Sequence, residues 1–295
     1  MSAASALKGV SSTIFSNLFV SLPYPEGDFG GQTIIVTGSN VGLGLEASKH
    51  IARLNAAKVI LGVRNLQKGE DAKKEILEAT GRDGSTVEVW HIDMDSYVSV
   101  KDFASRAVTL PRLDALVANA GIATTKFAVS EDNEKTITTN VVSTFLLSML
   151  LLPKLRESAA QFGGTPRIVI PNSALHYVAP LKELEGNGAI FDTLNDPKTA
   201  DMDSRYPLSK LLVIYALREL HKAAEASQKG TVIVNTPNPS YCKSQLTRET
   251  EGFGIKVAEK LLARTTEAGS RALVHGLLAG PESNGQYLTN CHVQV

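Results

Sequence analysis

The sequence is poor in the residue types that mark several specialised classes of protein. Only two of its 295 residues are cysteines, Cys242 and Cys291, and aromatic residues make up 6%. Two cysteines are too few for a disulfide framework, and neither has the paired spacing with histidine that a zinc site needs. We therefore expect no metal centre and a reduced, cytoplasmic setting.

An excess of charge of one sign is also missing, because 30 Lys and Arg residues balance 30 Asp and Glu residues. A chain without a basic stripe lacks the surface that neutralises a run of phosphates, so nucleic acid is not an expected partner. Long hydrophobic runs are absent as well. The most apolar run, 141–152, contains hydroxyl side chains and falls short of the roughly 20 residues that cross a bilayer. It predicts a buried helix and no transmembrane segment.

The N-terminal stretch 6–22 is mildly amphipathic, with one lysine and no clear small-residue cleavage site. These features favour a packing or lid helix over a signal peptide. Pro23 and Pro25 separate this stretch from the first expected strand, and no later segment has the composition of a linker. We expect an N-terminal extension over 1–30 and a single domain over 31–295.

Strand-like and helical patterns alternate through that domain, in which short β-branched runs are separated by amphipathic stretches. This order is typical of repeated βαβ units, whose parallel sheet lies between two helical layers. The sequence therefore predicts a doubly wound (Rossmann) α/β fold of about seven parallel strands with helices on both faces. The expected strands are 33–37, 58–63, 86–92, 113–118, 167–170, 231–235 and, at the edge, 286–289. The expected helices are 44–54, 67–79, 98–108, 133–156, 207–226 and 266–278.

The first expected strand runs directly into a glycine-rich loop and then into a helix. The spacing Gly-x-x-x-Gly-x-Gly is wider than the Gly-x-Gly-x-x-Gly fingerprint but stands in the same strand–loop–helix context. Glycines let the backbone approach a pyrophosphate, and the helix offers free amides and the positive end of its dipole. We expect residues 31–295 to form a dinucleotide-binding catalytic domain whose loop contacts the cofactor through Gly38, Ser39, Asn40, Gly42, Leu43 and Gly44.

The end of the second expected strand selects between two dinucleotides. An acidic residue there binds the ribose 2′-hydroxyl of NAD, whereas an arginine accommodates the 2′-phosphate of NADP. The strand ends Leu61-Gly62-Val63-Arg64-Asn65, without a carboxylate. Arg64 therefore indicates NADP(H), with a plain surface arginine as the alternative.

Three further motifs follow in order along the chain. Asn119-Ala120-Gly121 comes after the fourth expected strand, Ser173 after the fifth, and Tyr206 and Lys210 form a Tyr-x-x-x-Lys pair. Together with the glycine loop, they make residues 30–290 resemble the short-chain dehydrogenase/reductase family. The long interval between Ser173 and Tyr206 and the opening run 28–32 are most similar to its retinol-dehydrogenase-like and WW-domain-oxidoreductase-like branch, especially the fungal members.

The resemblance implies roles for individual residues. The family's catalytic positions are occupied by Asn140, Ser173, Tyr206 and Lys210. Asp93 stands where the family contacts adenine, and Asn119 and Gly121 stand on the adenosine ribose side. Tyr206, Lys210 and Pro239 stand at the nicotinamide end. For a homodimer, the resemblance implies contacts through the helices at 133–156 and 206–226.

The implied chemistry needs these residue types. Hydride transfer to a carbonyl builds charge on oxygen, so a proton donor such as Tyr206 must lie within hydrogen-bond reach. A tyrosine pKa near 10 has to fall by about 3 units, or roughly 4 kcal/mol, to work at neutral pH. Lys210, four residues on along a helix, lies on the same face and favours the phenolate. Ser173 orients the substrate oxygen, and the resemblance implies that Asn140 holds a proton-relaying water.

Three positions depart from the family pattern: Ser240, Pro171 and the neighbouring Asn172. Ser240 stands where glycine is usual, and a side chain there is costly if the backbone has a positive φ. Pro171 falls at the end of the fifth expected strand, where a proline removes a ladder donor.

These features predict an NADP(H)-dependent oxidoreductase that acts on a carbonyl or alcohol of a hydrophobic small molecule, in fungal secondary metabolism by resemblance. The segments 178–205, a long aperiodic loop, and 238–254 are expected to form a substrate lid. Ser240 leaves open a non-redox isomerase, lyase or cyclase on the same fold. A non-catalytic nucleotide-binding protein is disfavoured, because such a protein has no use for Ser173, Tyr206 and Lys210 together.

Overall fold

The computed structural model describes residues 13–185, 189–243 and 262–294. Within these residues an eight-stranded, mostly parallel sheet has the order β10-β9-β8-β7-β4-β1-β2-β3. Only β10 is antiparallel to its neighbour. The main strands are β1 (Thr33–Thr37), β2 (Lys58–Val63), β3 (Val87–His91), β4 (Ala115–Val117), β7 (Arg167–Val169), β8 (Ile233–Asn238), β9 (Tyr287–Thr289) and β10 (His292–Val293). The predicted doubly wound α/β fold is confirmed.

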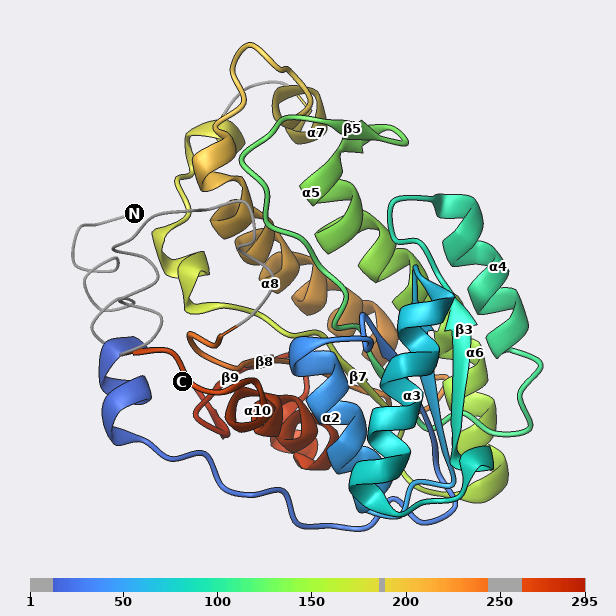
Figure 1. Ribbon diagram of the computed structural model, residues 1–295. Helices are drawn as coiled ribbons and strands as arrows, with labels where there is room; N and C mark the ends of the chain where they lie inside the picture. The colour runs from blue at the N-terminus through green and yellow to red at the C-terminus, as the bar shows by residue number, and fades with distance from the viewer. Residues whose placement is uncertain (1–12, 186–188, 244–261, 295) are drawn as a thin grey trace.

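Helices cover both faces of this sheet (Figure 1). One layer contains α2 (Gly42–Arg53), α3 (Leu66–Thr80) and α10 (Thr266–Leu278). The other contains α4 (Tyr97–Ala107), α6 (Thr144–Phe162) and α8 (Met202–Ala226). Shorter elements are α5 (Lys135–Ile137), α7 (Ile190–Leu194), the π-helical turn η2 (Thr138–Ser143), and the 3₁₀ turns η1 (Gly84–Thr86), η3 (Ala174–Val178), η4 (Lys182–Leu184) and η6 (Pro281–Ser283).

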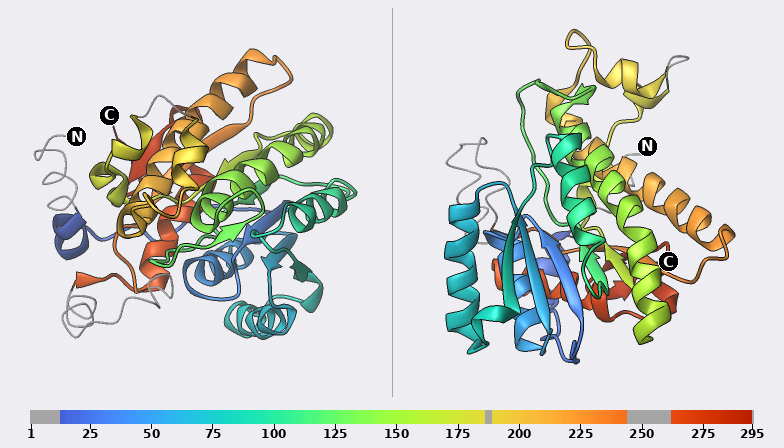
Figure 2. Two further views of the ribbon diagram at one scale, coloured as in Figure 1. Left: turned by 90° about the horizontal axis from the view of Figure 1, so that it is seen from above. Right: turned by 90° about the vertical axis from the view of Figure 1, so that its right-hand side faces the viewer.

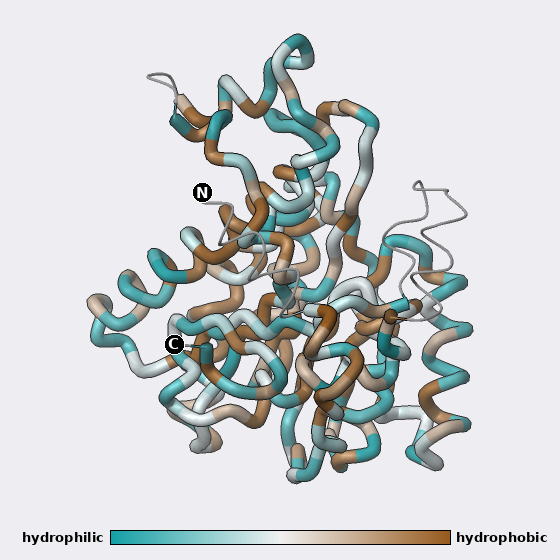
Figure 3. The backbone as a smooth tube through the Cα atoms, turned by 90° about the vertical axis from the view of Figure 1, so that its left-hand side faces the viewer, coloured by the Kyte–Doolittle hydropathy of each residue, from teal (hydrophilic) through white to brown (hydrophobic). Residues whose placement is uncertain are grey.

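Alternation along β1 explains why two separate cores form. Ile34 and Val36 pack with α2, α3 and α10, whereas Ile35 packs on the other face with α4, α6 and α8. Successive strand side chains point to opposite faces, so a strand buried on both sides is apolar throughout. The tube in Figure 3 alternates between brown and teal along the outer helices, as expected of helices with one buried face.

The apolar run 141–152 lies in the helical stretch 135–162, which is long and apolar enough to cross a membrane. In this structure 67% of its most apolar window is buried inside the protein. It is therefore a core helix, as predicted.

The elements above the carboxyl ends of the strands were harder to predict. The expected loop 178–205 contains η4 and α7, and its last four residues already belong to α8. A small hairpin of β5 (Val129–Ser130) and β6 (Asn133–Glu134) was not expected, and β10 displaces β9 from the sheet edge. The views in Figures 1 and 2 show α7 and the hairpin projecting from the same end of the molecule.

The N-terminal residues 13–19 form a short helix, and an extended chain then runs from it to β1 (Figure 1). Residues 1–12 of the expected extension and 244–254 of the expected lid lie outside the described residues.

Candidate active site

A pocket of about 360 Å³ lies at the carboxyl ends of β1, β2 and β4. Ligands of doubly wound sheets bind at this edge, because the loops that follow the strands meet there. Its lining includes Gly38, Asn40, Gly42, Leu43, Arg64, Asp93, Asn119, Gly121, Tyr206, Lys210 and Pro239, all predicted from the sequence.

The glycine loop packs so closely on the segment after β4 that a side chain would not fit at two of its positions. A Cβ added to Gly38, whose φ is +65°, would lie 2.9 Å from Ala120 Cα, and one added to Gly44 would lie 2.5 Å from Asn119 Nδ2. Asn119 Nδ2 donates to the carbonyls of Thr37 (2.9 Å) and Gly38 (3.2 Å). The Asn119 side chain therefore holds the glycine loop against the segment after β4.

The start of α2 faces this loop with its amide groups uncapped. Its N-cap residue, Val41, has no side chain that can accept a hydrogen bond, and the first turn contains no acidic residue. The first N–H groups of a helix have no partner within the helix, and with the dipole they attract an anion. The loop and helix thus have the donors that a pyrophosphate requires.

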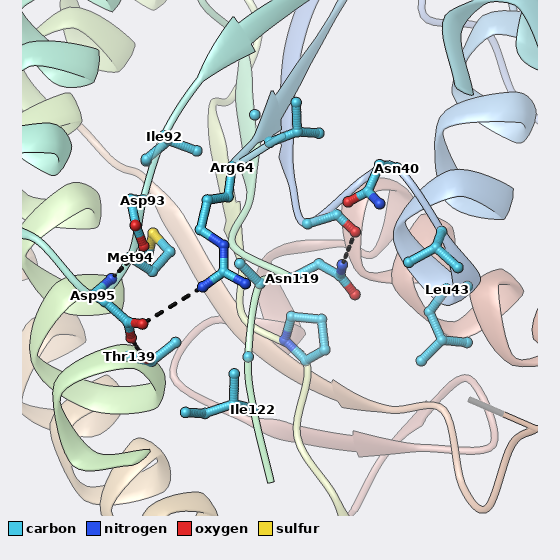
Figure 4. Close-up of a pocket in the computed structure, with 18 of the residues that line it drawn as sticks. Asn40, Leu43, Arg64, Ile92, Asp93, Met94, Asp95, Asn119, Ile122 and Thr139 are labelled. Atoms are coloured by element: carbon cyan, nitrogen blue, oxygen red, sulfur yellow. Dashed lines mark hydrogen bonds and ion pairs between the residues drawn. The ribbon is translucent and has the colours of Figure 1, made fainter. Parts of the chain in front are cut away.

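Arg64 crosses the mouth of the pocket between Asp95 on one side and Asn40 and Asn119 on the other (Figure 4). Its Nη1 lies 3.7 Å from Asp95 Oδ2, and its side chain is 69% exposed. Asp95 has closer partners, because Lys135 Nζ lies at 2.7 Å and Thr139 Oγ1 donates to it at 2.6 Å. Arg64 is therefore held loosely, and its guanidinium is open to a further anion.

Sequence reasoning missed Asp95, which lines the pocket two residues after the predicted Asp93. The two are linked, since the Asp95 amide donates to Asp93 Oδ1 at 3.0 Å. The signal available in the sequence was the spacing Asp-x-Asp directly after a strand.

Tyr206 and Lys210 project from α8 into the pocket, four residues apart as the pattern predicted. Lys210 Nζ lies 5.7 Å from the centroid of the Tyr206 ring, and Tyr206 forms a side-chain hydrogen bond with Ser173. Ser173 Oγ also accepts from the Leu175 amide at 3.2 Å, which fixes the hydroxyl at the start of η3. The structure thus brings Ser173, Tyr206 and Lys210 together.

The ionisation of this pair differs from the expectation. Burial raises the pKa of Tyr206, against a smaller lowering by the Ser173 hydrogen bond, and burial lowers the pKa of Lys210 to about 8. The Lys210 ammonium donates to the Pro171 carbonyl at 2.8 Å. The net shift of the Tyr206 pKa is therefore upward and not downward as predicted, because desolvation of the phenolate outweighs the neighbouring ammonium, which is directed at a carbonyl.

Pro171 thus has a use that its sequence position did not suggest. β7 ends at Val169, so the missing N–H of Pro171 costs no ladder hydrogen bond, and its carbonyl anchors Lys210. The expectation that this proline disturbs a strand is wrong, because the strand is shorter than predicted.

Asn140 lies in the π-helical turn η2 rather than in a regular helix. Its side chain clamps the backbone of Ile122, accepting from the amide at 2.9 Å and donating to the carbonyl at 2.9 Å. It also donates to Ser209 Oγ at 3.1 Å on α8. Asn140 therefore links the segment after β4 to the helix that carries Tyr206.

Four predicted residues do not line the pocket. Asn140 contacts the lining residue Ile122, and Ser173 is hydrogen-bonded to the lining residue Tyr206. Gly44 is buried against the Asn119 side chain. The Ser39 hydroxyl is fully buried and donates to the Val36 carbonyl at 2.9 Å. Its side chain is directed into the fold and away from the pocket.

Ser240, which stands where glycine is usual, has a positive φ of +66°. A left-handed conformation costs a non-glycine residue about 1–2 kcal/mol. The chain nevertheless adopts it next to Pro239, which lines the pocket.

A buried ion cluster next to Tyr206 was also missed by sequence reasoning. Arg205 is 0% exposed, its Nη2 donates to Glu183 Oε1 at 3.0 Å, and its Nε lies 3.7 Å from Glu134 Oε2. Glu134 in turn accepts from the amides of Thr136 and Ile137 at the start of α5. The cluster joins α8, α5 and the segment around η4 at the position immediately before Tyr206.

Comparisons with known proteins agree with this geometry. Residues 32–173 match the model of the family described as short chain dehydrogenase. The chain is 46% identical over 284 residues to the short chain dehydrogenase/reductase dmxR8 of Cryptosporiopsis sp., covering 95% of this chain and 87% of that protein. It is also 46% identical over 283 residues to the short chain dehydrogenase atnD of Emericella nidulans, covering 94% and 90%.

Solved structures of low sequence identity share the fold. A short chain dehydrogenase from Shigella flexneri matches with a TM-score of 0.64 at 22% identity, over 90% of this chain and 94% of that one. An alcohol dehydrogenase from Thermococcus sibiricus, complexed with 5-hydroxy-NADP, matches with a TM-score of 0.60 at 16% identity, over 88% and 95%.

We predict that Arg205→Met destabilises the protein by about 3–5 kcal/mol, because it leaves two buried carboxylates without their cation. The matched control is Lys222→Met, which removes an exposed ion pair with Glu219 and should change stability by less than about 1 kcal/mol. Urea unfolding of both variants measures the difference. Equal stabilities for the two variants would contradict a structural role for the cluster.

Proposed function

This chain belongs to the short-chain dehydrogenase/reductase family, in the form found in fungi, and within it we propose an NADP(H)-dependent oxidoreductase. It transfers a hydride between the nicotinamide and a carbonyl or alcohol of a hydrophobic small molecule. The observation that carries the proposal is that one pocket is lined both by the glycine loop and Arg64 and by Tyr206 and Lys210.

The residues present fit a nicotinamide dinucleotide. A side chain at Gly38 or Gly44 would collide with Asn119 or Ala120, and the uncapped start of α2 supplies amides for the pyrophosphate. Asp93 would contact the adenine, Asn119 and Gly121 would line the adenosine ribose side, and Tyr206, Lys210 and Pro239 would lie at the nicotinamide end. When bound, the dinucleotide supplies or accepts the hydride.

Arg64 carries the choice of NADP(H) over NAD(H). Its guanidinium is exposed at the end of β2, and Lys68 lines the same part of the pocket. Asp95 lies closer to Lys135 than to Arg64, so one carboxylate is shared between two cations and the charge of Arg64 is not fully neutralised. Two cations at this point favour a 2′-phosphate.

Tyr206 supplies the proton in the reducing direction. Its raised pKa keeps the phenol neutral, which is the form that can donate to a substrate oxygen. Ser173, bonded to Tyr206, orients that oxygen, and Lys210 stabilises the phenolate left after proton transfer. Asn140, through Ile122 and Ser209, holds the walls of the site in register and is proposed to bind the relay water.

A hydrophobic substrate is supported by exposed apolar side chains in the part of the sequence between Ser173 and α8. They are Leu175 in η3, and Ile190 and Phe191 in α7. We propose that the described part of 178–205, with residues 238–243, borders the substrate. The relatives are short chain dehydrogenases of fungi, and a place in fungal secondary metabolism is part of the proposal.

The non-redox alternative was motivated only by Ser240. Since the chain adopts the positive φ at this residue, no observation among the described residues favours an isomerase, lyase or cyclase.

Setting and assembly complete the proposal. Cys242 and Cys291 are both buried free thiols, which supports a reduced, cytoplasmic setting. Met149 on α6 and Tyr215 on α8 are exposed apolar side chains on the two helices expected at a dimer interface. We expect a homodimer in sedimentation equilibrium, and a mass of 31.5 kDa would contradict it.

Tyr206→Phe tests the proposed chemistry. Loss of the general acid should lower ketone or aldehyde reduction by about 10²–10⁴-fold while NADPH still binds. Tyr24→Phe, at an exposed tyrosine that does not line the pocket, is the matched control and should keep full activity. Full reductase activity in Tyr206→Phe would refute the assignment.

Arg64→Leu tests the cofactor preference. A charge-assisted hydrogen bond contributes about 1.5–3 kcal/mol, so the KM for NADPH should rise about 10- to 100-fold. The KM for NADH, which has no 2′-phosphate, should stay the same and serves as the internal control. Equal changes for the two cofactors would show that Arg64 does not contact the phosphate.

The pH profile of reduction tests the role of Lys210. Because its lowered pKa is about 8, Lys210 is charged below that pH and loses its charge above it. We expect kcat/KM for carbonyl reduction to be level below pH about 8 and to fall above it, as the cation that stabilises the phenolate is lost. The residual activity of Lys210→Arg should lack this decline, because arginine stays charged. A decline at the same pH in that variant would assign it to another group.

A further inference from the structure

The loop that follows β8 borders the nicotinamide end of the pocket and is held from two sides. Within the domain, the Ser240 amide donates to Asn238 Oδ1 at 2.9 Å, and further contacts come from the N-terminal helix. Pro239 lines the pocket with Tyr206 and Lys210, and Ser240 follows it with a φ of +66°. Such a backbone is rarely adopted by a residue other than glycine, so the surroundings must hold it there.

Asn17, on the N-terminal helix 13–19, contacts this loop through every polar atom of its side chain. Its Oδ1 accepts from Ser240 Oγ at 2.6 Å, and its Nδ2 donates to the carbonyls of Tyr241 and Leu262 at 2.7 Å each. Two carbonyls can bind only the amide nitrogen, so the oxygen must face the Ser240 hydroxyl. The side chain is therefore oriented in one way.

The helix is itself fixed by polar contacts rather than by apolar burial. Arg264 Nη2 donates to the carbonyls of Ser16 (2.7 Å) and Val20 (2.8 Å), and Asn290 Nδ2 donates to Ser16 Oγ at 2.8 Å. Among residues 13–20 only Ser16 is buried, while Phe15 and Phe19 are exposed. A helix that buries so little apolar surface contributes little to the core. Its hydrogen bonds to residues 240–241 therefore have a role other than stabilising the core.

We propose that Asn17 and Ser240 are positioning residues for the nicotinamide half of the dinucleotide, so that the N-terminal helix completes the cofactor site. Their hydrogen bond holds Ser240 in its left-handed conformation and thereby places Pro239 against the pocket. Glycine would adopt this φ without strain but has no side chain. The Ser240 hydroxyl adds a hydrogen bond that ties the loop to the N-terminal helix. The inference rests on the proposed dinucleotide function.

The test compares two ligands on the full-length protein. NADPH occupies the whole site, whereas 2′,5′-ADP occupies only the adenosine half. Asn17→Leu, Ser240→Ala and the double variant are titrated with both ligands by calorimetry, and the thermal midpoint of each variant is recorded. Ser16→Ala, which removes the Asn290 hydrogen bond from the same helix without touching Ser240, is the matched control.

We expect each single variant to weaken NADPH binding about tenfold, the factor that about 1.4 kcal/mol represents. Binding of 2′,5′-ADP should be unchanged. The double variant should bind NADPH no more weakly than Asn17→Leu, because Asn17→Leu already removes the hydrogen bond that Ser240→Ala removes. Ser240→Gly separates the hydroxyl from the strain: it relieves the positive φ but should also weaken NADPH binding. Ser16→Ala should bind both ligands as the wild type does.

Unchanged NADPH binding in Ser240→Ala and Ser240→Gly would overturn the inference. So would equal losses for NADPH and 2′,5′-ADP that follow the thermal midpoint, since these would show a merely structural contact. A wild-type protein that binds neither ligand would instead refute the proposed function.

Discussion

The close approach of the glycine loop to the segment after β4 is the constraint on which the rest of the site depends. Neither Gly38 nor Gly44 has room for a Cβ, because Asn119 and Ala120 lie against them. Asn119 uses its amide to bind the carbonyls of Thr37 and Gly38, so the loop and the sheet are joined by hydrogen bonds at one edge. With the backbone fixed in this way, the amides at the start of α2 face the pocket.

A second constraint is the partial desolvation of the residues proposed for catalysis. Tyr206 and Lys210 are half-buried at the pocket wall, and this desolvation keeps the phenol neutral while it makes the ammonium easier to deprotonate. Their surroundings are held by groups further out: the Pro171 carbonyl binds Lys210, Asn140 clamps Ile122, and Arg205 ties the start of α8 to two buried carboxylates. The proposed chemistry thus rests on a polar frame that spans several elements.

The sequence was most informative where local patterns decide the structure. The runs 33–37 and 58–63 are strands with the expected bounds, because buried parallel strands are mostly apolar on both faces. The first of them ends at the glycine-rich loop and the second at Arg64 and Asn65. The glycine loop and the Tyr-x-x-x-Lys spacing pointed to six residues that line the pocket: Gly38, Asn40, Gly42, Leu43, Tyr206 and Lys210. Long-range partners could not be read in this way. Neither the contact of Ser240 with Asn17 nor the contact of Arg205 with Glu134 has a spacing that marks it, and the pKa of Tyr206 depends on burial that only the fold creates.

The most direct measurement is a calorimetric titration of the wild-type protein with NADPH and, separately, with NADH. The account predicts that both bind and that NADPH binds at least about tenfold more tightly, which corresponds to about 1.4 kcal/mol from the 2′-phosphate at Arg64. Equal or tighter binding of NADH would contradict the assignment of Arg64. Failure to bind either nucleotide would contradict the pocket itself as a dinucleotide site.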